Sequence, residues 1–103
     1  MEMKKNQQLE YPWNFIDAVL KEPLSDDVDR AEVERGLEYL LSTMVSEDTR
    51  TMIELKYRDG MTQYAIAEQL RVTPSLVGER IRKAVRRFHG PHYNTFLKQG
   101  YTE

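Results

Sequence analysis

Residues 47–88 decide the fold of this chain, and they read EDTRTMIELKYRDGMTQYAIAEQLRVTPSLVGERIRKAVRRF. The stretch holds three segments with apolar residues at helical spacing, and a residue that caps helices well precedes each one: Ser46, Thr62 and Thr73. Gly60 follows the first segment, where a helix often ends on a left-handed residue. The second and third segments, separated by a short turn, predict a helix-turn-helix.

The third segment, residues 74–88, has two chemically different sides. Its inward side is apolar at intervals of three and four residues, and it consists of Val77, Ile81, Ala84 or Val85, and Phe88. Its outward side is polar with a single anion, and it consists of Ser75, Glu79, Arg82, Lys83 and Arg86. A helix of this kind fits the major groove of duplex DNA, where its N-terminal residues meet base edges and later residues meet phosphates.

The place of each residue along this helix gives its expected role. We predict that the residues at the N-terminal end read bases, namely Ser75, Leu76, Gly78 and Glu79. We predict that the cations further along hold phosphates, namely Arg82, Lys83, Arg86 and Arg87. The helix N-termini capped by Thr62 and Thr73 add unpaired amides that bind phosphate. Arg80 lies beside the buried side, so an ion pair with Glu68 is favoured over a DNA contact.

The overall charge hides an asymmetry that supports this assignment. The formal net charge is -2, yet residues 1–60 contain 8 Lys or Arg and 14 Asp or Glu, whereas residues 61–103 contain 7 and 3. All but one of the C-terminal cations fall within residues 71–87. Because binding to nucleic acid depends on the local field, the near-neutral total does not argue against DNA.

Length and composition limit the class of protein. A chain of 103 residues with 40% hydrophobic and 31% charged residues fits one soluble domain. No apolar run approaches the ~20 residues of a membrane span, and no apolar segment follows the first lysines as in a secretory signal. The sequence has no cysteine, which excludes disulfides and fits a cytoplasmic protein without membrane contact.

The remaining segments complete an all-α chain without strand-like alternation. We predict four parts: an N-terminal arm over 1–24 with a short apolar helix beginning near Pro12, an acidic amphipathic support helix over 25–45, the helix-turn-helix over 46–89, and a tail over 90–103. The support helix should be about 19 residues long. Its expected N-cap is Ser25, with acidic residues in the first turns: Asp26, Asp27 and Asp29. The expected architecture is a small helical bundle with a C-terminal helix-turn-helix.

Two apolar groups outside the helix-turn-helix need a surface to cover. The N-terminal group is Trp13, Phe15, Ile16, Val19 and Leu20, and the tail group is Tyr93, Phe96 and Leu97. Packing on the domain's own core is the favoured interpretation for both. The alternative is a contact with a partner or a second protomer, so a homodimer through the arm or the tail stays open.

Residues 46–88 resemble region 4 of the sigma-70 family, the domain that recognises the -35 promoter element, and most of all its extracytoplasmic-function type. The resemblance rests on three motifs: YRDGMT at 57–62, IAEQLRV at 66–72 and VGERIRKA at 77–84. It implies a helix-turn-helix that binds promoter DNA. It also implies a possible second contact, with the flap of the RNA polymerase β subunit.

The chain departs from the family pattern at three places. Arg71 stands where the turn usually has Gly, which calls for either a strained φ or a slightly different turn. Gly78 lies inside the third helix, where it costs about 1 kcal/mol relative to Ala; it either allows close approach to DNA or is tolerated drift. Residues 74–76 stand where primary sigma factors carry charged base readers. Region 2, with which full sigma factors melt the -10 element, is not expected, because residues 1–45 are too short and too acidic to supply it.

The leading hypothesis is a sequence-specific transcription regulator that binds duplex DNA, with residues 74–88 as its recognition helix. The alternative is an accessory protein or half of a split sigma factor that acts mainly through contacts with the RNA polymerase core. An enzyme is not expected, because the sequence has no phosphate loop, nucleophile–base pair or metal-ligand cluster. His89 and His92 have no nearby Cys or carboxylate, so neither a metal nor another cofactor is expected.

Overall fold

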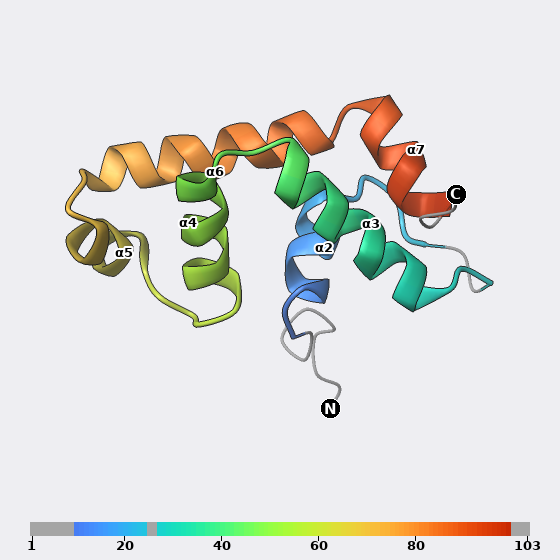
Figure 1. The fold of residues 1–103 in the computed structure, drawn as a ribbon, viewed down its shortest axis with the longest axis horizontal. Coiled ribbons are helices and arrows are strands. Elements are labelled where there is room, and N and C mark those ends of the chain that lie inside the picture. The colour runs from blue at the N-terminus through green and yellow to red at the C-terminus, as the bar shows by residue number, and fades with distance from the viewer. Residues whose placement is uncertain (1–9, 25–26, 100–103) are drawn as a thin grey trace.

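The computed structural model describes residues 10–24 and 27–99, and Figure 1 shows them as a set of packed helices. In chain order the helices are α2 (Trp13–Val19), α3 (Arg30–Thr43), α4 (Glu47–Tyr57), α5 (Gln63–Leu70), α6 (Pro74–Phe88) and α7 (Pro91–Gln99). The described residues contain no strand, so the predicted all-α fold is confirmed. None of these helices is both long and apolar enough to cross a membrane.

Helix α6 is the element on which the others assemble. In Figure 1 it runs along the top of the molecule, with α4 and α5 below one half and α2, α3 and α7 around the other. Helices α2, α4, α5 and α7 all pack against it. Its buried side consists of Val77, Ile81, Ala84 and Phe88, as the periodicity predicts, with Ala84 rather than Val85 in the buried position.

Three side-chain caps fix the starts of α4, α5 and α6. The hydroxyl of Ser46 accepts a hydrogen bond from the amide of Thr49, and Thr62 and Thr73 do the same for the amides three residues ahead, each at 3.1 Å. Each cap satisfies one of the backbone donors that a helix start leaves unpaired. The predicted starts of all three helices are confirmed.

The start of α3 differs from the prediction. The helix begins at Arg30 and has 14 residues, and its N-cap is Asp29, whose Oδ1 accepts from the amide of Ala31 at 3.0 Å. The expected N-cap Ser25 and its neighbour Asp26 lie outside the described residues. The first fully buried residue of α3 is Val33, so packing gives no reason for the helix to start much earlier, and Asp29, the last aspartate before that residue, caps it.

The N-terminal apolar group belongs to the core. Phe15, Ile16 and Val19 of α2 are 0% exposed. The ring of Phe15 meets Tyr57 of α4 edge-on at 5.1 Å and Phe88 of α6 at 6.5 Å between centroids. Helix α2 therefore covers the junction of α4 and α6, in agreement with the favoured interpretation.

The tail also folds back on the core, and a buried amide that the sequence did not reveal holds it there. Leu97 is 0% exposed, and Asn94 is 5% exposed. The Asn94 side chain donates to the carbonyl oxygens of Val19 at 2.8 Å and Phe88 at 2.9 Å, and its Oδ1 accepts from the amide of Lys21 at 3.0 Å. One carboxamide thus links α7 to the ends of α2 and α6.

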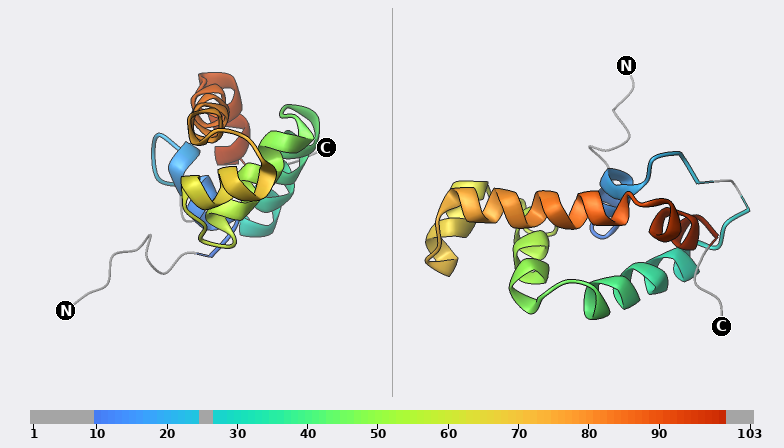
Figure 2. Two further views of the ribbon diagram at one scale, coloured as in Figure 1. Left: turned by 90° about the vertical axis from the view of Figure 1, so that its left-hand side faces the viewer. Right: turned by 90° about the horizontal axis from the view of Figure 1, so that it is seen from above.

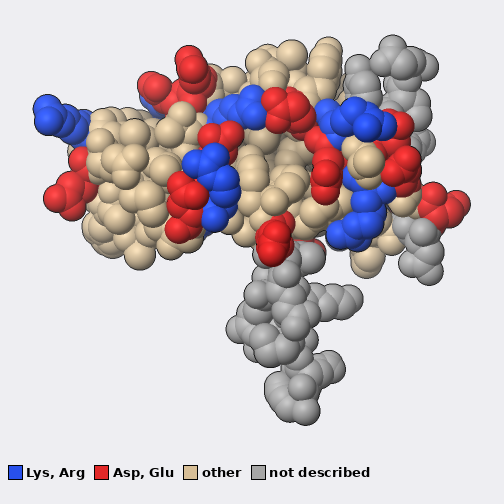
Figure 3. Space-filling view, turned by 60° about the horizontal axis from the view of Figure 1, so that its bottom comes forward, with Lys and Arg blue, Asp and Glu red and all other residues tan. Residues whose placement is uncertain are grey.

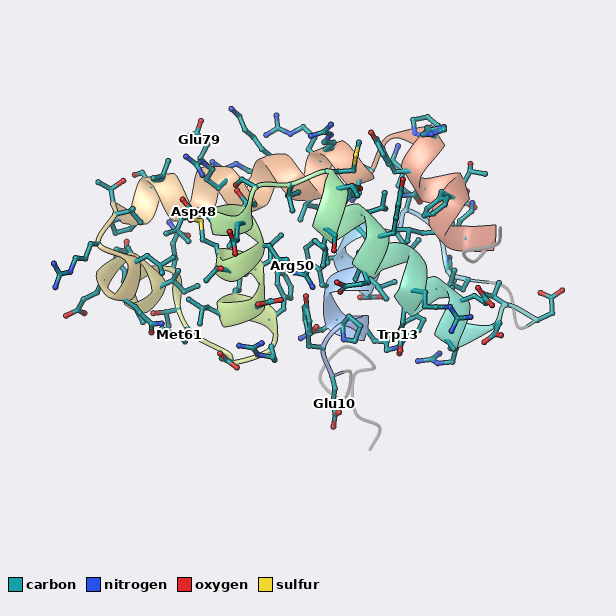
Figure 4. The ribbon with its side chains drawn as sticks, viewed as in Figure 1. Glu10, Trp13, Asp48, Arg50, Met61 and Glu79 are labelled. Carbon is teal, nitrogen blue, oxygen red and sulfur yellow. The ribbon has the colours of Figure 1, made fainter. Side chains whose placement is uncertain are left out.

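An ion-pair network joins α3 to α4. The Arg50 guanidinium lies between the two helices in Figure 4, and it contacts Glu38 at 2.7 Å and Glu54 at 3.1 Å. The hydrogen bond to Glu38 is the largest of the effects that raise the pKa of Arg50, while its partial burial acts in the opposite direction. At least one carboxylate on the acidic side of α3 therefore serves the fold.

The buried amide gives a stability prediction. Replacing Asn94 by Ala removes three hydrogen bonds and leaves the carbonyls of Val19 and Phe88 unpaired, so Asn94→Ala should lower the free energy of unfolding by about 2–4 kcal/mol. Chemical denaturation with helical circular dichroism as the signal measures this value. The matched control is Thr95→Ala, an exposed neighbour on the same helix. A change for Asn94→Ala no larger than that of the control contradicts the linking role.

Candidate nucleic-acid interface

Helices α5 and α6 form a helix-turn-helix around a tight three-residue turn at 71–73. Ala67 is 3% exposed where α5 packs on α6, so a small residue occupies the close approach of the two helices. The amide of Val72 donates to the carbonyl of Ala67 at 3.0 Å and closes the end of α5. The turn thus sets the position of Thr73, from which α6 begins.

Arg71, which stands where the turn usually has glycine, adopts the left-handed backbone conformation. Its φ and ψ are 61° and 47°, in the region that L-residues other than Gly, Asn and Asp rarely occupy. Gly60, before α5, has a φ of 71°. The turn of the helix-turn-helix therefore contains a left-handed residue, and the strained backbone is that of Arg71.

The outward row of α6 is open along its whole length. Ser75, Glu79, Arg82, Lys83 and Arg86 are all exposed. Seen from above in Figure 2, α6 runs in front of the other described helices, and none of them crosses it. Glu79 points away from α4 in Figure 4 and lies 3.8 Å from Lys83. Such an exposed pair contributes little energy, so it leaves Lys83 free to exchange partners.

The other predicted residues lie on the edges of this row. Thr62 and Thr73 are exposed caps at the starts of α5 and α6, while Leu76 and Gly78 are half-buried. Arg87 is exposed but its Nη1 donates to the carbonyl of Met44 at 2.9 Å, which ties the end of α6 to the end of α3. All the predicted contacts thus lie on or next to one side of the helix-turn-helix, with Arg87 partly committed to the fold.

Gly78 has a structural role that the sequence did not indicate. The side chain of Gln63, the first residue of α5, lies across it and donates from Nε2 to the carbonyl oxygen of Pro74 at 2.7 Å. A Cβ on residue 78 would lie 2.9 Å from that same Nε2. Glycine therefore makes room for a long polar side chain from the preceding helix. A glycine in a recognition helix together with a long amide at the start of the helix before it is the signal that could have predicted this contact.

Cations are distributed unevenly over the molecule. Arg35, Arg50, Arg58 and Lys98 each lie within 4.0 Å of a carboxylate. Within residues 10–24 and 27–99, no carboxylate lies in ion-pair range of the α6 arginines 80, 82, 86 and 87, so the expected Arg80–Glu68 pair is not formed there. The face turned forward in Figure 3 carries acidic and basic side chains next to one another. Excess positive charge therefore gathers at α6.

The two histidines have local contacts. His89 Nε2 lies 3.1 Å from the carbonyl oxygen of Ala18, and the ring of His92 meets Tyr93 edge-on. Across the described part of the chain, no group of three His, Asp or Glu side chains is arranged to hold a metal.

The fold and this face define a helix-turn-helix module of the kind that serves transcription by binding DNA. Residues 39–88 match the family model of sigma-70, region 4, a range that starts in the second half of α3 and ends with α6. These residues are a sigma-70 region 4 domain, and the predicted family is confirmed. Comparisons with curated proteins and with solved structures gave no match.

The strained turn gives a prediction about stability. Left-handed geometry costs a non-glycine residue roughly 1–2 kcal/mol, and the greater freedom of unfolded glycine cancels part of that gain, so Arg71→Gly should raise the free energy of unfolding by about 0.5–1 kcal/mol. Gly60→Ala should lower it by about 1 kcal/mol, because no described residue lies within 4 Å of the added Cβ and only the backbone is strained. Urea denaturation of the two variants checks both signs. A loss of stability in Arg71→Gly contradicts the assignment.

Proposed function

We propose that this protein is a sequence-specific transcription regulator that binds duplex DNA, with α6 inserted in the major groove. The observation that carries the proposal is the uncovered row on α6, which has about three helical turns of exposed polar and charged side chains opposite a buried apolar side. A helix anchored in this way presents its outer side rigidly. The backbone of that side is therefore already ordered before DNA binds, and only the side chains lose freedom.

The residues divide along α6 by their chemistry. Ser75 and Glu79 can exchange hydrogen bonds with base edges, and a glutamate accepts from the amino group of cytosine. Arg82, Lys83 and Arg86 follow on the same side, where they meet phosphates with charge-assisted hydrogen bonds. The amides behind the caps Thr62 and Thr73 supply further donors to phosphate. Leu76, Gly78 and Arg87 lie beside the outward row of α6 and are the remaining residues that we propose contact DNA.

Charge pairing explains how a chain with a net charge of -2 would be attracted to a polyanion. Among the described residues, Arg35, Arg50, Arg58 and Lys98 off α6 are paired with carboxylates, whereas on α6 only Lys83 is, and α6 carries five cations against one carboxylate. Their field is therefore directed outward from one side of the molecule. This arrangement supports an orientation in which α3, with its exposed Glu34 and Glu38, stays away from DNA.

The same acidic side of α3 favours a second function. Exposed carboxylates repel DNA but suit a protein partner, so the chain could act as an accessory of the RNA polymerase core or as half of a split sigma factor. We also propose that the protein forms a homodimer through the N-terminal arm (1–24) or the C-terminal tail (90–103). The apolar residues of α2 and Leu97 of α7 serve the core, which leaves only the exposed residues of these helices for such a contact.

Charge reversal tests the groove assignment. Arg82→Glu with Lys83→Glu should weaken binding to every duplex by at least about a hundredfold at low salt, because two phosphate contacts become repulsive. Fluorescence anisotropy with labelled duplex measures the affinity. The matched control is Lys21→Glu with Arg35→Glu, which makes the same change in net charge at exposed sites off α6. If the α6 variant binds duplex DNA as tightly as the wild type, the assignment of α6 to the major groove is wrong.

Selection of bound sequences from a random duplex pool tests specificity. An enriched motif is the expected result, and a palindromic motif would indicate a dimer. Copurification with core RNA polymerase distinguishes the second function. A stable polymerase complex that survives the Arg82 and Lys83 reversals, together with no enriched motif, would favour the accessory role over DNA recognition.

A further inference from the structure

Two hollows border α6, one on each side of its outward row. The first, called the α4–α5 hollow, is lined by Lys56 of α4, Gln63 of α5, and Gly78 and Arg82 of α6, among others. The second, called the α3–α4 hollow, lies between the turn at 44–46 and α6, which contributes Arg80, Lys83 and Arg87. At about 100° per residue, Gly78 and Arg80 point to opposite sides of the helix. The hollows are therefore separated by the helix itself.

The lining of these two hollows differs in charge from that of other hollows on the molecule. Among the described residues, each of the two is lined by at least two Lys or Arg side chains and by no carboxylate. Three other hollows include carboxylates: Asp17 and Glu22 beside α2, Glu47 and Glu54 between α3 and α4, and Glu10 beside Tyr11. A hollow with cations and without a competing carboxylate is suited to an anion.

Hydrogen bonds within the protein already hold a donor side chain in each hollow. In the α4–α5 hollow, Nε2 of Gln63 uses one hydrogen for the carbonyl of Pro74, and its second hydrogen remains for a ligand. The absence of a side chain at Gly78 is what allows this amide to lie there. In the α3–α4 hollow, the bond from Arg87 to Met44 holds that guanidinium at the rim. Both sites are thus partly preorganised.

The separation of the hollows fits duplex DNA. A helix with its side chains is about 10–12 Å across, and the major groove is about 12 Å wide. With the outward row of α6 in the groove, the two sides of the helix face the two phosphate backbones that border it. We propose that each hollow binds a backbone phosphate, one from each strand, with Lys56 and Gln63 on one side and Arg80 on the other. This inference rests on the proposed function, since it requires α6 in the major groove.

Salt dependence of binding tests the charged contacts. On a duplex of random sequence, Lys56→Gln and Arg80→Gln should each weaken binding about three- to tenfold and reduce the slope of log K against log salt by about 0.9, and the double variant by about 1.8. Arg80→Lys keeps the charge and should keep the slope. Arg35→Gln, an exposed arginine off α6, is the matched control and should behave as wild type. Thermal unfolding verifies that the half-buried Arg80 can be replaced without loss of the fold.

The amide is tested separately. Gln63→Ala should weaken binding without changing the salt slope, because the group is neutral. Gly78→Ala should have the same effect, since its Cβ displaces the amide, and the double variant should be no weaker than either single one. Wild-type affinity in Gln63→Ala overturns the role of Gln63.

The strand assignment is tested by phosphate ethylation interference on the enriched duplex, or on the random duplex with a single fixed end if no motif is enriched. In the wild type, ethylation of either contacted phosphate should weaken DNA binding. The effect of one phosphate should disappear in Lys56→Gln and that of another in Arg80→Gln, and these two phosphates should lie on opposite strands. Two phosphates on the same strand, or wild-type salt slopes in both variants, overturn the inference. If only the inference fails, the Arg82 and Lys83 charge reversals still weaken DNA binding. If the proposed function itself fails, the wild-type protein does not bind duplex DNA.

Discussion

The packing of one side of α6 is the constraint on which the rest of the structure depends. Helices α2, α4, α5 and α7 all pack against this helix, and Val77, Ile81, Ala84 and Phe88 form its buried side. Because 3.6 residues make a turn, burying these positions also fixes which residues point outward. The buried side and the outward row of α6 therefore both follow from the same helical periodicity. Inserting or deleting one residue in this helix would disrupt both.

This coupling explains why much of the fold was predictable. Hydroxyl caps, an αL glycine and an apolar stripe are local signals, and their chemistry acts within a few residues of the chain. The caps Ser46, Thr62 and Thr73 and the buried side of α6 were all identified from such signals. The start of α3 was misplaced because several cap residues compete there, and only the position of the core selects Asp29.

Interactions between distant residues were not predictable in the same way. Asn94 bonds to Val19 and Lys21, more than seventy residues away, and its identity alone does not distinguish a buried link from a surface amide. The Gln63–Gly78 contact and the commitment of Arg87 to Met44 also depend on how helices cross. The cationic row of the candidate site was visible in the sequence. The hollows beside it were not, because each one takes residues from different helices.

The carboxamide of Asn94 has a consequence for how the molecule opens. Terminal segments usually fray independently, each with its own low opening free energy. Here the hydrogen bonds of the first and last described helices meet on one side chain, so the release of α7 leaves the end of α2 with unpaired groups, and the reverse also holds. The two ends of the described chain should therefore behave as one cooperative unit in native-state hydrogen exchange. The helix-turn-helix at the opposite end of α6 can stay closed while that unit opens.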